Sequence, residues 1–319
     1  REVLAEQGFD ANVVTLAVDT HDAPITKALA TDSRIAIVDY TGSSEFGTWI
    51  EQNAGQAVVF TEKAGVNSMI IDSVDDLKAV TGNIAFTLSL YSGQMCTTPQ
   101  NIFIPAGGID TGDGHKSFDE AAAAIVKAVD WLLGDPKRGA EILGAIQSPR
   151  TLSRIDQAKR EGGEVLRDSE PVANEHFPDA RVRSPLILKL DHTQQDLYMR
   201  EMFGPIFYIV ATADTNQSIE LASRAAGELG AITCAVYSTN PGVLEQAQDA
   251  AVAAGVPISC NLTGQIFVNQ SAAFSDFHVS GANPSGNATF CDAAFVANRF
   301  RVVQSRMPVP VEAEAHAGV

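Results

Sequence analysis

The sequence predicts an α/β fold in which most of the strands run parallel. Short runs of apolar, often β-branched residues alternate with segments of helical periodicity along most of the chain, which is the pattern of strand–helix–strand units. Glycine stands at junctions between these segments, as in the turn after the run RIAIVD. The chain has 319 residues, 45% of them hydrophobic, so it can form two domains or one large one around a sizeable core.

The N-terminal part of the chain contains two predicted strands with a helix between them. The run RIAIVD predicts a buried strand, and it leads through Tyr40-Thr41-Gly42 into that helix. The elements predicted in this part are, in order, a helix at 1–8, a short β-branched run at 13–18, a helix at 21–30, a strand at 34–39, a helix at 44–53 and a strand at 57–60.

The middle of the chain continues the alternation. Ser117, followed three residues later by Glu120, forms a capping box, which predicts a helix that starts there and ends at Gly134. The other elements predicted here are helices at 75–90, 151–160, 218–229 and 243–254, and strands at 102–105, 186–190, 206–211, 231–238 and 256–261.

The C-terminal part has a different composition. Residues 263–287 are rich in Gly, Ser, Asn and Phe and predict a long loop. Residues 295–305 alternate in the manner of an edge strand. From about residue 308, Pro, Ala and acidic residues predict a disordered tail.

Charge and cysteine usage argue against several classes of function. A formal net charge of −17 repels a phosphate backbone, so we expect no nucleic-acid partner. No apolar run reaches the roughly 18 to 20 residues of a membrane span, and no signal peptide is visible. The four cysteines lie far apart, with no CxxC pair and no histidine at ligand spacing. We therefore expect no metal site, no disulfide framework and reduced thiols in a cytoplasm.

Two short motifs carry the residue types of nucleophilic catalysis. Cys96 follows the turn Ser92-Gly93-Gln94, where backbone N–H groups can stabilise a thiolate or an oxyanion. Glu62 stands at the end of a predicted strand, just before Gly65, where active-site carboxylates are often found. Each motif alone is more often structural, because a lone cysteine is usually a small buried hydrophobe and a glutamate in a turn is usually solvated.

Two further motifs lie next to predicted strands. The turn from Gly42 to Gly47 joins a strand to a helix, and such a turn brings backbone N–H groups and a helix N-terminus to a phosphate. Its spacing is neither a Walker A loop nor a GxGxxG fingerprint, so it also fits an ordinary turn. The second motif is Glu201-Met202-Phe203-Gly204-Pro205, before the strand at 206–211.

Together and in this order, the four motifs resemble the aldehyde dehydrogenase superfamily. The Gly42 turn resembles that family's GSTxxG, Glu62 falls in an E-x-x-G segment, and Cys96 falls in a G-Q-x-C segment. Glu62 and Cys96 are 34 positions apart, the separation expected for that pair. The resemblance covers residues 1 to about 305. Segments 96–101 and 269–277 further resemble the phenylacetic acid degradation (PaaN-type) branch, which acts on a ring-derived aldehyde, as a coenzyme A conjugate.

The resemblance implies oxidation of an aldehyde to a carboxylic acid with NAD or NADP. The cysteine adds to the aldehyde, hydride passes to the nicotinamide, and a glutamate activates the water that hydrolyses the resulting thioester. The implied roles are nucleophile for Cys96, general base for Glu62, pyrophosphate contacts for Gly42, Ser43 and Gly47, ribose contact for Glu201, nicotinamide contact for Phe203, and substrate pocket for Phe274. His278 lies in the loop near that pocket, so we also assign it to the substrate pocket.

The resemblance also implies an architecture and an oligomer. Residues 1–61 would be the remnant of a Rossmann-like cofactor domain, 62–285 a parallel-sheet catalytic domain, 286–306 an oligomerisation strand region and 307–319 a disordered tail. A free edge strand near residue 300 is an aggregation liability that pairing across a homodimer or homotetramer would remove.

The sequence departs from the family pattern in places, and two alternatives stay open. The usual E-L-G-G-K block reads Glu62-Lys63-Ala64-Gly65-Val66. An upstream asparagine and lysine of the family have no counterpart here, so we expect this chain to look truncated, to bind NAD(P) poorly and to turn over slowly or not at all. The alternatives are cysteine-based acyl transfer or esterase action at Cys96, and a non-catalytic scaffold or subunit.

Overall fold

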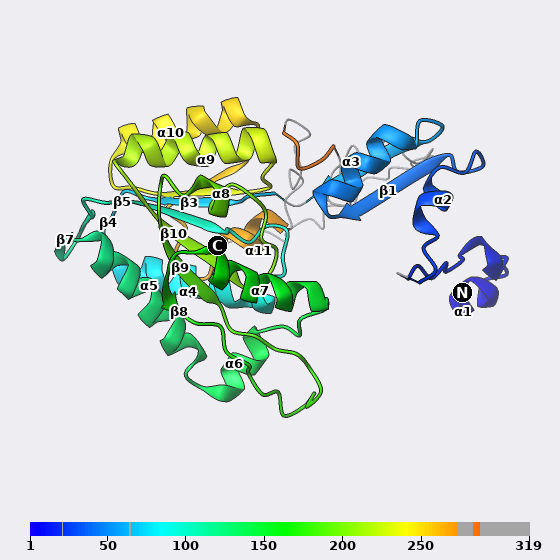
Figure 1. Ribbon diagram of the computed structural model, residues 1–319, viewed down its shortest axis with the longest axis horizontal. Coiled ribbons are helices and arrows are strands. Elements are labelled where there is room, and N and C mark those ends of the chain that lie inside the picture. Colours follow the sequence, from blue (N-terminus) through cyan, green and yellow to red (C-terminus); the bar gives the residue numbers. More distant parts are fainter. Residues whose placement is uncertain (21, 64, 274–282, 288–319) are drawn as a thin grey trace, which may run out of the picture.

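The computed structural model describes residues 1–20, 22–63, 65–273 and 283–287. Within these residues it confirms the α/β class, because the strands of its two main parallel arrangements alternate with helices along the chain. A two-stranded sheet carries the first strands, and a seven-stranded sheet carries most of the rest (Figure 1). The proposed division into domains stays a prediction.

The small sheet consists of β1 (Ile37–Gly42) and β2 (Val58–Lys63), which pair in parallel from Ile37↔Val58 to Gly42↔Lys63. Helix α3 (Ser44–Asn53) connects them and begins where the sequence predicts. The reason is local, since the Ser43 side chain accepts a hydrogen bond from the Phe46 N–H and caps the helix.

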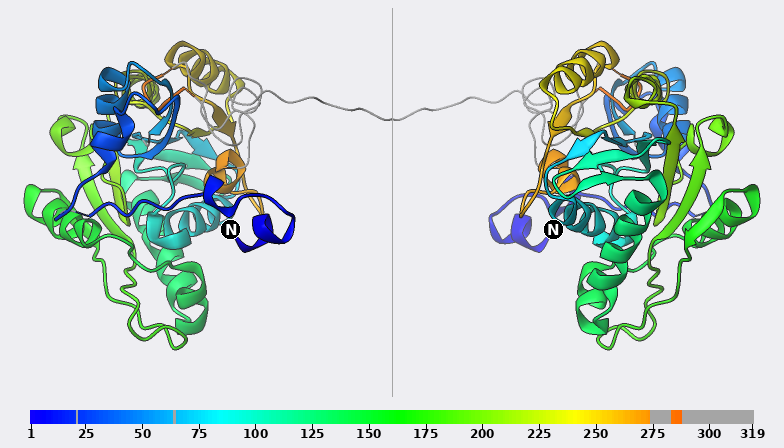
Figure 2. Two further views of the ribbon diagram at one scale, coloured as in Figure 1. Left: turned by 90° about the vertical axis from the view of Figure 1, so that its right-hand side faces the viewer. Right: turned by 90° about the vertical axis from the view of Figure 1, so that its left-hand side faces the viewer.

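The segment before β1 is less regular than predicted and projects from the body of the molecule (Figures 1 and 2). Its elements are α1 (Glu2–Glu6), a 3₁₀ turn η1 (Ala11–Val13) and α2 (Thr26–Ala30). The predicted helix at 21–30 is therefore shorter, and the β-branched run at 13–18 forms no strand. Val13, Leu16 and Val18 are mostly exposed, so no packing partner in the described residues supports an extended structure there.

The large sheet has the strand order β12-β11-β3-β5-β10-β9-β8 and is parallel except for β8, which pairs antiparallel with β9. Its strands are β3 (Ser68–Ile71), β5 (Asn101–Pro105), β8 (Glu164–Arg167), β9 (Leu186–Asp191), β10 (Ile206–Thr212), β11 (Cys234–Tyr237) and β12 (Ile258–Cys260). Strand β3 was not predicted, because it is a fully buried strand of four residues and is too short for a periodic signal.

Helices cover both faces of the large sheet, as parallel sheets require. Helices α9 (Thr215–Leu229) and α10 (Pro241–Ala254) lie on one face, and α4 (Leu77–Ser89) and α5 (Phe118–Leu133) on the other (Figures 1 and 2). Two separate hydrophobic cores result, one around Tyr208 and Leu188 and the other around Ile102 and Phe207. The capping box of Ser117 and Glu120 at the start of α5 is confirmed.

The remaining elements lie around this body. A small sheet is formed by β4 (Ser73–Val74), β6 (Ile109–Thr111) and β7 (Gly114–Lys116). Further helical elements are the 3₁₀ turn η2 (Leu90–Gly93), α6 (Pro136–Ile142), α7 (Pro149–Glu161) and α8 (Gln195–Tyr198).

The prediction of a continuous loop at 263–287 is wrong, because α11 (Val268–Ala273) lies inside it. Tertiary contacts explain this short helix better than its sequence does. Val268 is completely buried, and the Asn269 side chain donates to the carbonyl of Thr87 at 3.1 Å. The predicted strand at 295–305 and the predicted tail lie outside the described residues.

Candidate active site

Cys96 follows a left-handed turn that the surrounding structure holds in place. Tyr91, Ser92 and Gly93 have φ angles of 53°, 54° and 65°, a region that costs energy for residues other than glycine. The fully buried Ser92 hydroxyl donates to the carbonyls of Gly144 and Arg183 at 2.9 and 2.8 Å. These bonds stabilise the unusual backbone, and the turn presents Cys96 to a cavity.

Gln94, the glutamine of the cysteine motif, ties the turn to the segment after α6. Its amide nitrogen donates to the carbonyls of Tyr91 and Ala145 at 3.0 and 2.9 Å. Its amide oxygen accepts from the Gln147 N–H at 3.1 Å. The Gln94 side chain thus bonds backbone groups around Cys96 and does not line the cavity beside it.

A buried asparagine, Asn67, fixes the other side of the cysteine. Its amide nitrogen donates to the carbonyl oxygens of Cys96 and Thr98 at 2.7 and 3.1 Å. Its oxygen accepts from the N–H groups of Ile232 and Thr233 at 2.8 and 3.0 Å. With all four contacts made inside the protein, Asn67 fixes Cys96 relative to β3 and β11.

The glutamate and the cysteine of the two predicted motifs meet. The Sγ atom of Cys96 lies 3.7 Å from Oε1 of Glu62, within hydrogen-bonding distance for sulfur. Glu62 comes from β2 of the small sheet, and Cys96 comes from the turn before β5 of the large sheet. The pair therefore spans the junction of the two sheets.

A cavity of about 350 Å³ opens beside this pair. Six of its lining residues belong to the predicted motifs, namely Gly42, Ser43, Glu62, Cys96, Glu201 and Phe203. Thr41 and Arg154 complete the lining. Strand ends and turns from both sheets thus converge on one chamber, which is where ligands bind in open α/β sheets.

Glu201 is held next to Cys96 by its neighbours in sequence. Gln100 accepts from the Met202 N–H at 2.7 Å and donates to the Arg200 carbonyl at 3.0 Å, and so connects the cysteine segment with this motif. A Cβ atom on Gly93 would lie 2.6 Å from the carbonyl oxygen of Gly204, so the two motifs touch through their glycines. Burial raises the pKa of Glu201, and the positive charge of Arg154 opposes that shift.

Gly47, a predicted pyrophosphate contact, is not among the residues that line this cavity, and its role toward the cofactor stays a prediction. It is buried in α3, and a Cβ atom there would lie 2.6 Å from Cδ of Lys63 and 3.0 Å from the Tyr40 ring. Close packing accounts for this glycine. Phe274 and His278, the predicted substrate-pocket residues, lie outside the described residues.

Three residues of the site escaped the sequence analysis. Arg154 lies in the middle of α7, and its guanidinium donates to the Phe203 carbonyl at 3.1 Å. Gln100 comes shortly after the cysteine motif and Asn67 lies 29 positions before Cys96, but nothing local shows that their side chains are buried. Only the tertiary contacts reveal them, so no sequence signal was available.

The described residues contain no group of three or more His, Cys, Asp or Glu side chains that could hold a metal ion. In the same part of the chain, no helix has the length and apolar character needed to cross a membrane.

Fold and site together define a class: an α/β protein with a cysteine and a glutamate facing each other beside a cavity between two parallel sheets. The family model described as the aldehyde dehydrogenase family matches residues 1–293, and the chain belongs to that family.

Solved structures share this fold. An NAD-dependent aldehyde dehydrogenase from Burkholderia multivorans is 56% identical, with a TM-score of 0.89 over 97% of this chain and 55% of its own. Betaine aldehyde dehydrogenase from Staphylococcus aureus, solved with NAD⁺, is 20% identical, with a TM-score of 0.64 over 83% of this chain and 52% of its own, and shows the fold alone.

Curated relatives are more distant. An N-succinylglutamate 5-semialdehyde dehydrogenase from Burkholderia ambifaria is 29% identical over 72% of this chain and 46% of its own length. A long-chain-aldehyde dehydrogenase from an Acinetobacter species is 27% identical over 86% of this chain and 53% of its own length. The chain spans about half the length of the curated relatives it matches.

Proposed function

We propose that the protein oxidises an aldehyde to a carboxylic acid with a nicotinamide dinucleotide, with Cys96 as the nucleophile and Glu62 as the general base. The contact that carries this proposal is the 3.7 Å approach of Cys96 Sγ to Glu62 Oε1 beside a cavity lined by Glu201 and Phe203. A scaffold has no use for this convergence.

The residues at this site fit two chemical steps. The Cys96 thiolate adds to the carbonyl carbon and forms a thiohemiacetal. When bound, the dinucleotide supplies the acceptor for the hydride that leaves this carbon, and a thioester on Cys96 remains. Glu62 then takes a proton from water as the water attacks the thioester carbonyl. The C–S bond breaks, the acid leaves, and Cys96 is free again.

The lining residues also fit the dinucleotide. Gly42 and Ser43 stand at the N-terminus of the ten-residue helix α3, where backbone N–H groups and the helix dipole favour a phosphate. The Glu201 carboxylate can accept hydrogen bonds from ribose hydroxyls, and Phe203 offers an apolar ring beside Cys96. We favour NAD over NADP because the 56% identical structure from Burkholderia multivorans is described as NAD-dependent.

The narrower assignments rest on resemblance. A ring-derived aldehyde, as a coenzyme A-conjugated semialdehyde, is our proposed substrate, on the strength of segments 96–101 and 269–277. The matched relatives are named for a semialdehyde and for long-chain aldehydes, which belong in the same test. We further propose a homodimer or homotetramer and a cytoplasmic location, where a catalytic thiol stays reduced.

The test follows NAD(P)H absorbance after the chain is mixed with NAD or NADP and an aldehyde panel that includes aromatic, long-chain and semialdehyde members. We expect at most a slow rise in absorbance with NAD, because the sequence predicts poor NAD(P) binding and slow turnover for this chain, and no rise in Cys96→Ala. Alkylation by iodoacetamide, mapped by mass spectrometry, gives a second reading, because a nucleophile reacts fast at neutral pH and a structural cysteine does not.

The chain contains its own reference thiols for that second reading. Cys260 is partly exposed like Cys96 but lies outside the cavity, and burial raises the pKa of Cys234 to about 12. Cys96 should react first, then Cys260, and Cys234 last. A flat absorbance together with a Cys96 that reacts no faster than Cys260 would contradict the proposal.

A further inference from the structure

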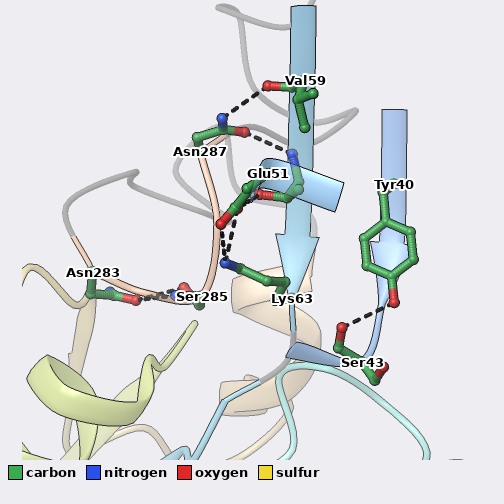
Figure 3. Close-up of polar contacts among 9 residues, drawn as sticks. Tyr40, Ser43, Glu51, Val59, Lys63, Asn283, Ser285 and Asn287 are labelled. Carbon is green, nitrogen blue, oxygen red and sulfur yellow. Dashed lines mark hydrogen bonds and ion pairs between the residues drawn. The ribbon is translucent and has the colours of Figure 1, made fainter. Parts of the chain in front are cut away.

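Lys63, the residue after the base, is a buried lysine with a partner on another element. It is 5% exposed, and its ammonium group lies 2.9 and 3.1 Å from the two carboxylate oxygens of Glu51 on α3 (Figure 3). The Thr61 hydroxyl donates to the same carboxylate at 2.5 Å. Burial raises the pKa of Glu51, but the bonds from Thr61 and Lys63 outweigh it and keep the carboxylate charged near neutral pH.

The side chains of β2 alternate between its two faces, and this alternation explains how the contacts bear on Glu62. Successive side chains of a strand point to opposite faces, so Thr61 and Lys63 share one face and Glu62 points to the other. Glu51 contacts the residues on both sides of Glu62, on the face covered by α3. It therefore fixes the strand immediately before and after the base without touching the base itself.

The free edge of β2 is held as well. The Lys63 N–H donates to the Ser285 carbonyl at 2.5 Å, and Glu62 forms an antiparallel bridge with Gly286. Asn287 accepts from the Thr61 N–H at 2.8 Å and donates to the Val59 carbonyl at 3.1 Å (Figure 3). Residues 285–287 thus lie along β2, joined to it by an isolated bridge and by hydrogen bonds.

The other end of the segment 283–287 is anchored on the large sheet's side of the molecule. Asn283 donates to the carbonyls of Ala231 and Gly255 at 3.0 and 2.8 Å. The same segment therefore connects the strand that carries Glu62 with the body that carries Cys96. Lys63 completes this support on the remaining side of β2, against α3.

We propose that Lys63, through its ion pair with Glu51, is a positioning residue that aims the Glu62 carboxylate at the thioester on Cys96. Gly47 serves the same device, because its missing side chain leaves room for the lysine stem, which a Cβ atom would meet at 2.6 and 2.7 Å. The proposal rests on the proposed function, since it assigns Lys63 to the hydrolytic step of that reaction.

The two steps can be separated without a dinucleotide. With 4-nitrophenyl acetate, the Cys96 thiolate attacks the ester carbonyl and 4-nitrophenolate leaves, so absorbance reports acetylation. After rapid desalting, intact-mass spectrometry follows loss of the acetyl group as water, deprotonated by Glu62, releases acetate. Cys96→Ala removes acetylation, and Glu62→Gln should slow hydrolysis about 100-fold or more.

Lys63→Met should slow hydrolysis about tenfold, because a small misplacement of a catalytic group is costly, while the acetylation rate stays within about twofold. Glu51→Gln breaks the same pair from its more exposed end and should also slow hydrolysis, which keeps the test alive if Lys63→Met fails to fold. The double variant should be no slower than the slower single variant, since the two side chains act as a unit.

Lys189→Met is the matched control. Lys189 also joins a strand to a helix through a carboxylate, at 2.5 Å from Asp119, but on β9 and away from the cavity. It should leave both steps unchanged. Normal hydrolysis rates in both Lys63→Met and Glu51→Gln, when both variants are folded, would overturn the inference. An equal fall in the acetylation and hydrolysis rates would also overturn it, because it would show that Lys63 has only a structural role. A native chain that takes up no acetyl group at Cys96 would overturn the proposed function, and the inference with it.

Discussion

Strands β5 and β11 of the large sheet have every residue buried, whereas β1 of the small sheet alternates between exposed and half-buried residues. Ile37 and Val58, at the start of the two small-sheet strands, are 44% and 57% exposed. Cys96 is therefore built on a body packed on both faces, while Glu62 and the turn that begins at Gly42 stand on a thin sheet that α3 packs against. The difference teaches that the site depends on a few specific contacts at the junction, not on a shared core.

The largest effect on stability is expected from a substitution that creates a cavity in the core of the large sheet. Phe103 in β5 is completely buried and packs edge-on against Tyr198. Phe103→Ala should lower the free energy of unfolding by about 3–5 kcal/mol, because the surrounding layers cannot collapse into the space. Guanidinium denaturation measures it. A loss below about 1 kcal/mol would mean that this body is far less tightly packed than its burial indicates.

The next largest loss of stability is expected at Asn67, whose side chain connects the large sheet with the segment that contains Cys96. Asn67→Ala leaves two buried N–H groups and two carbonyls without their partner, and should cost about 3 kcal/mol. It should also change the rate of Cys96 alkylation. Asn83→Ala is the control, since Asn83 is equally buried but, within the part of the chain that the structure describes, its side chain bonds one carbonyl, that of Ile266. Equal alkylation rates in the two variants would refute the anchoring role.

A smaller change in the free energy of unfolding, this time an increase, is expected when Glu201 is replaced. Its raised pKa means that the native state binds the proton more tightly than the unfolded state does. Stability is therefore lost as pH rises from about 4.5 through the native pKa. Glu201→Gln should unfold at a higher urea concentration than the native chain at pH 7.5, and the gap should close near pH 4. A gap that is independent of pH would show that ionisation is not its source.

The smallest effect is expected in the small sheet. Val58→Ala shortens an exposed side chain at the start of β2 and should change the free energy of unfolding by less than about 0.5 kcal/mol. Denaturation of Val58→Ala and Phe103→Ala side by side compares the stability lost in the small sheet with that lost in the large sheet. A loss above 2 kcal/mol would mean that β2 is covered in solution and that the two sheets are more alike than they look.

Local signals gave the elements with clear caps and periods. Helix α5 was predicted from the box of Ser117 and Glu120, because a capping box is formed by residues close together in the sequence. Helix α3 was predicted from the glycine turn after the run RIAIVD, and its cap by Ser43 became clear only in the structure. β3 and α11 were missed, since four buried residues or one helical turn carry no period, and packing decides their structure.

The site divides in the same way. Cys96, Glu62 and Glu201 could be named from short motifs whose order resembles one family, and the structure brings them to one cavity. Lys63 was visible only as a departure from the usual block. Its pairing with Glu51 depends on which face of α3 packs against β2, and a local sequence pattern does not determine that orientation.

The contact between Gly93 and Gly204 also bears on how this protein can be rebuilt. Gly93 cannot gain a side chain unless the backbone of Gly204 moves, and Gln100 binds the same two segments together. Residues 90–101 and 200–207 must therefore be exchanged together, although about a hundred residues separate them in the sequence. A chimaera that takes one segment from a distant relative should lose the site, and one that takes both should keep it.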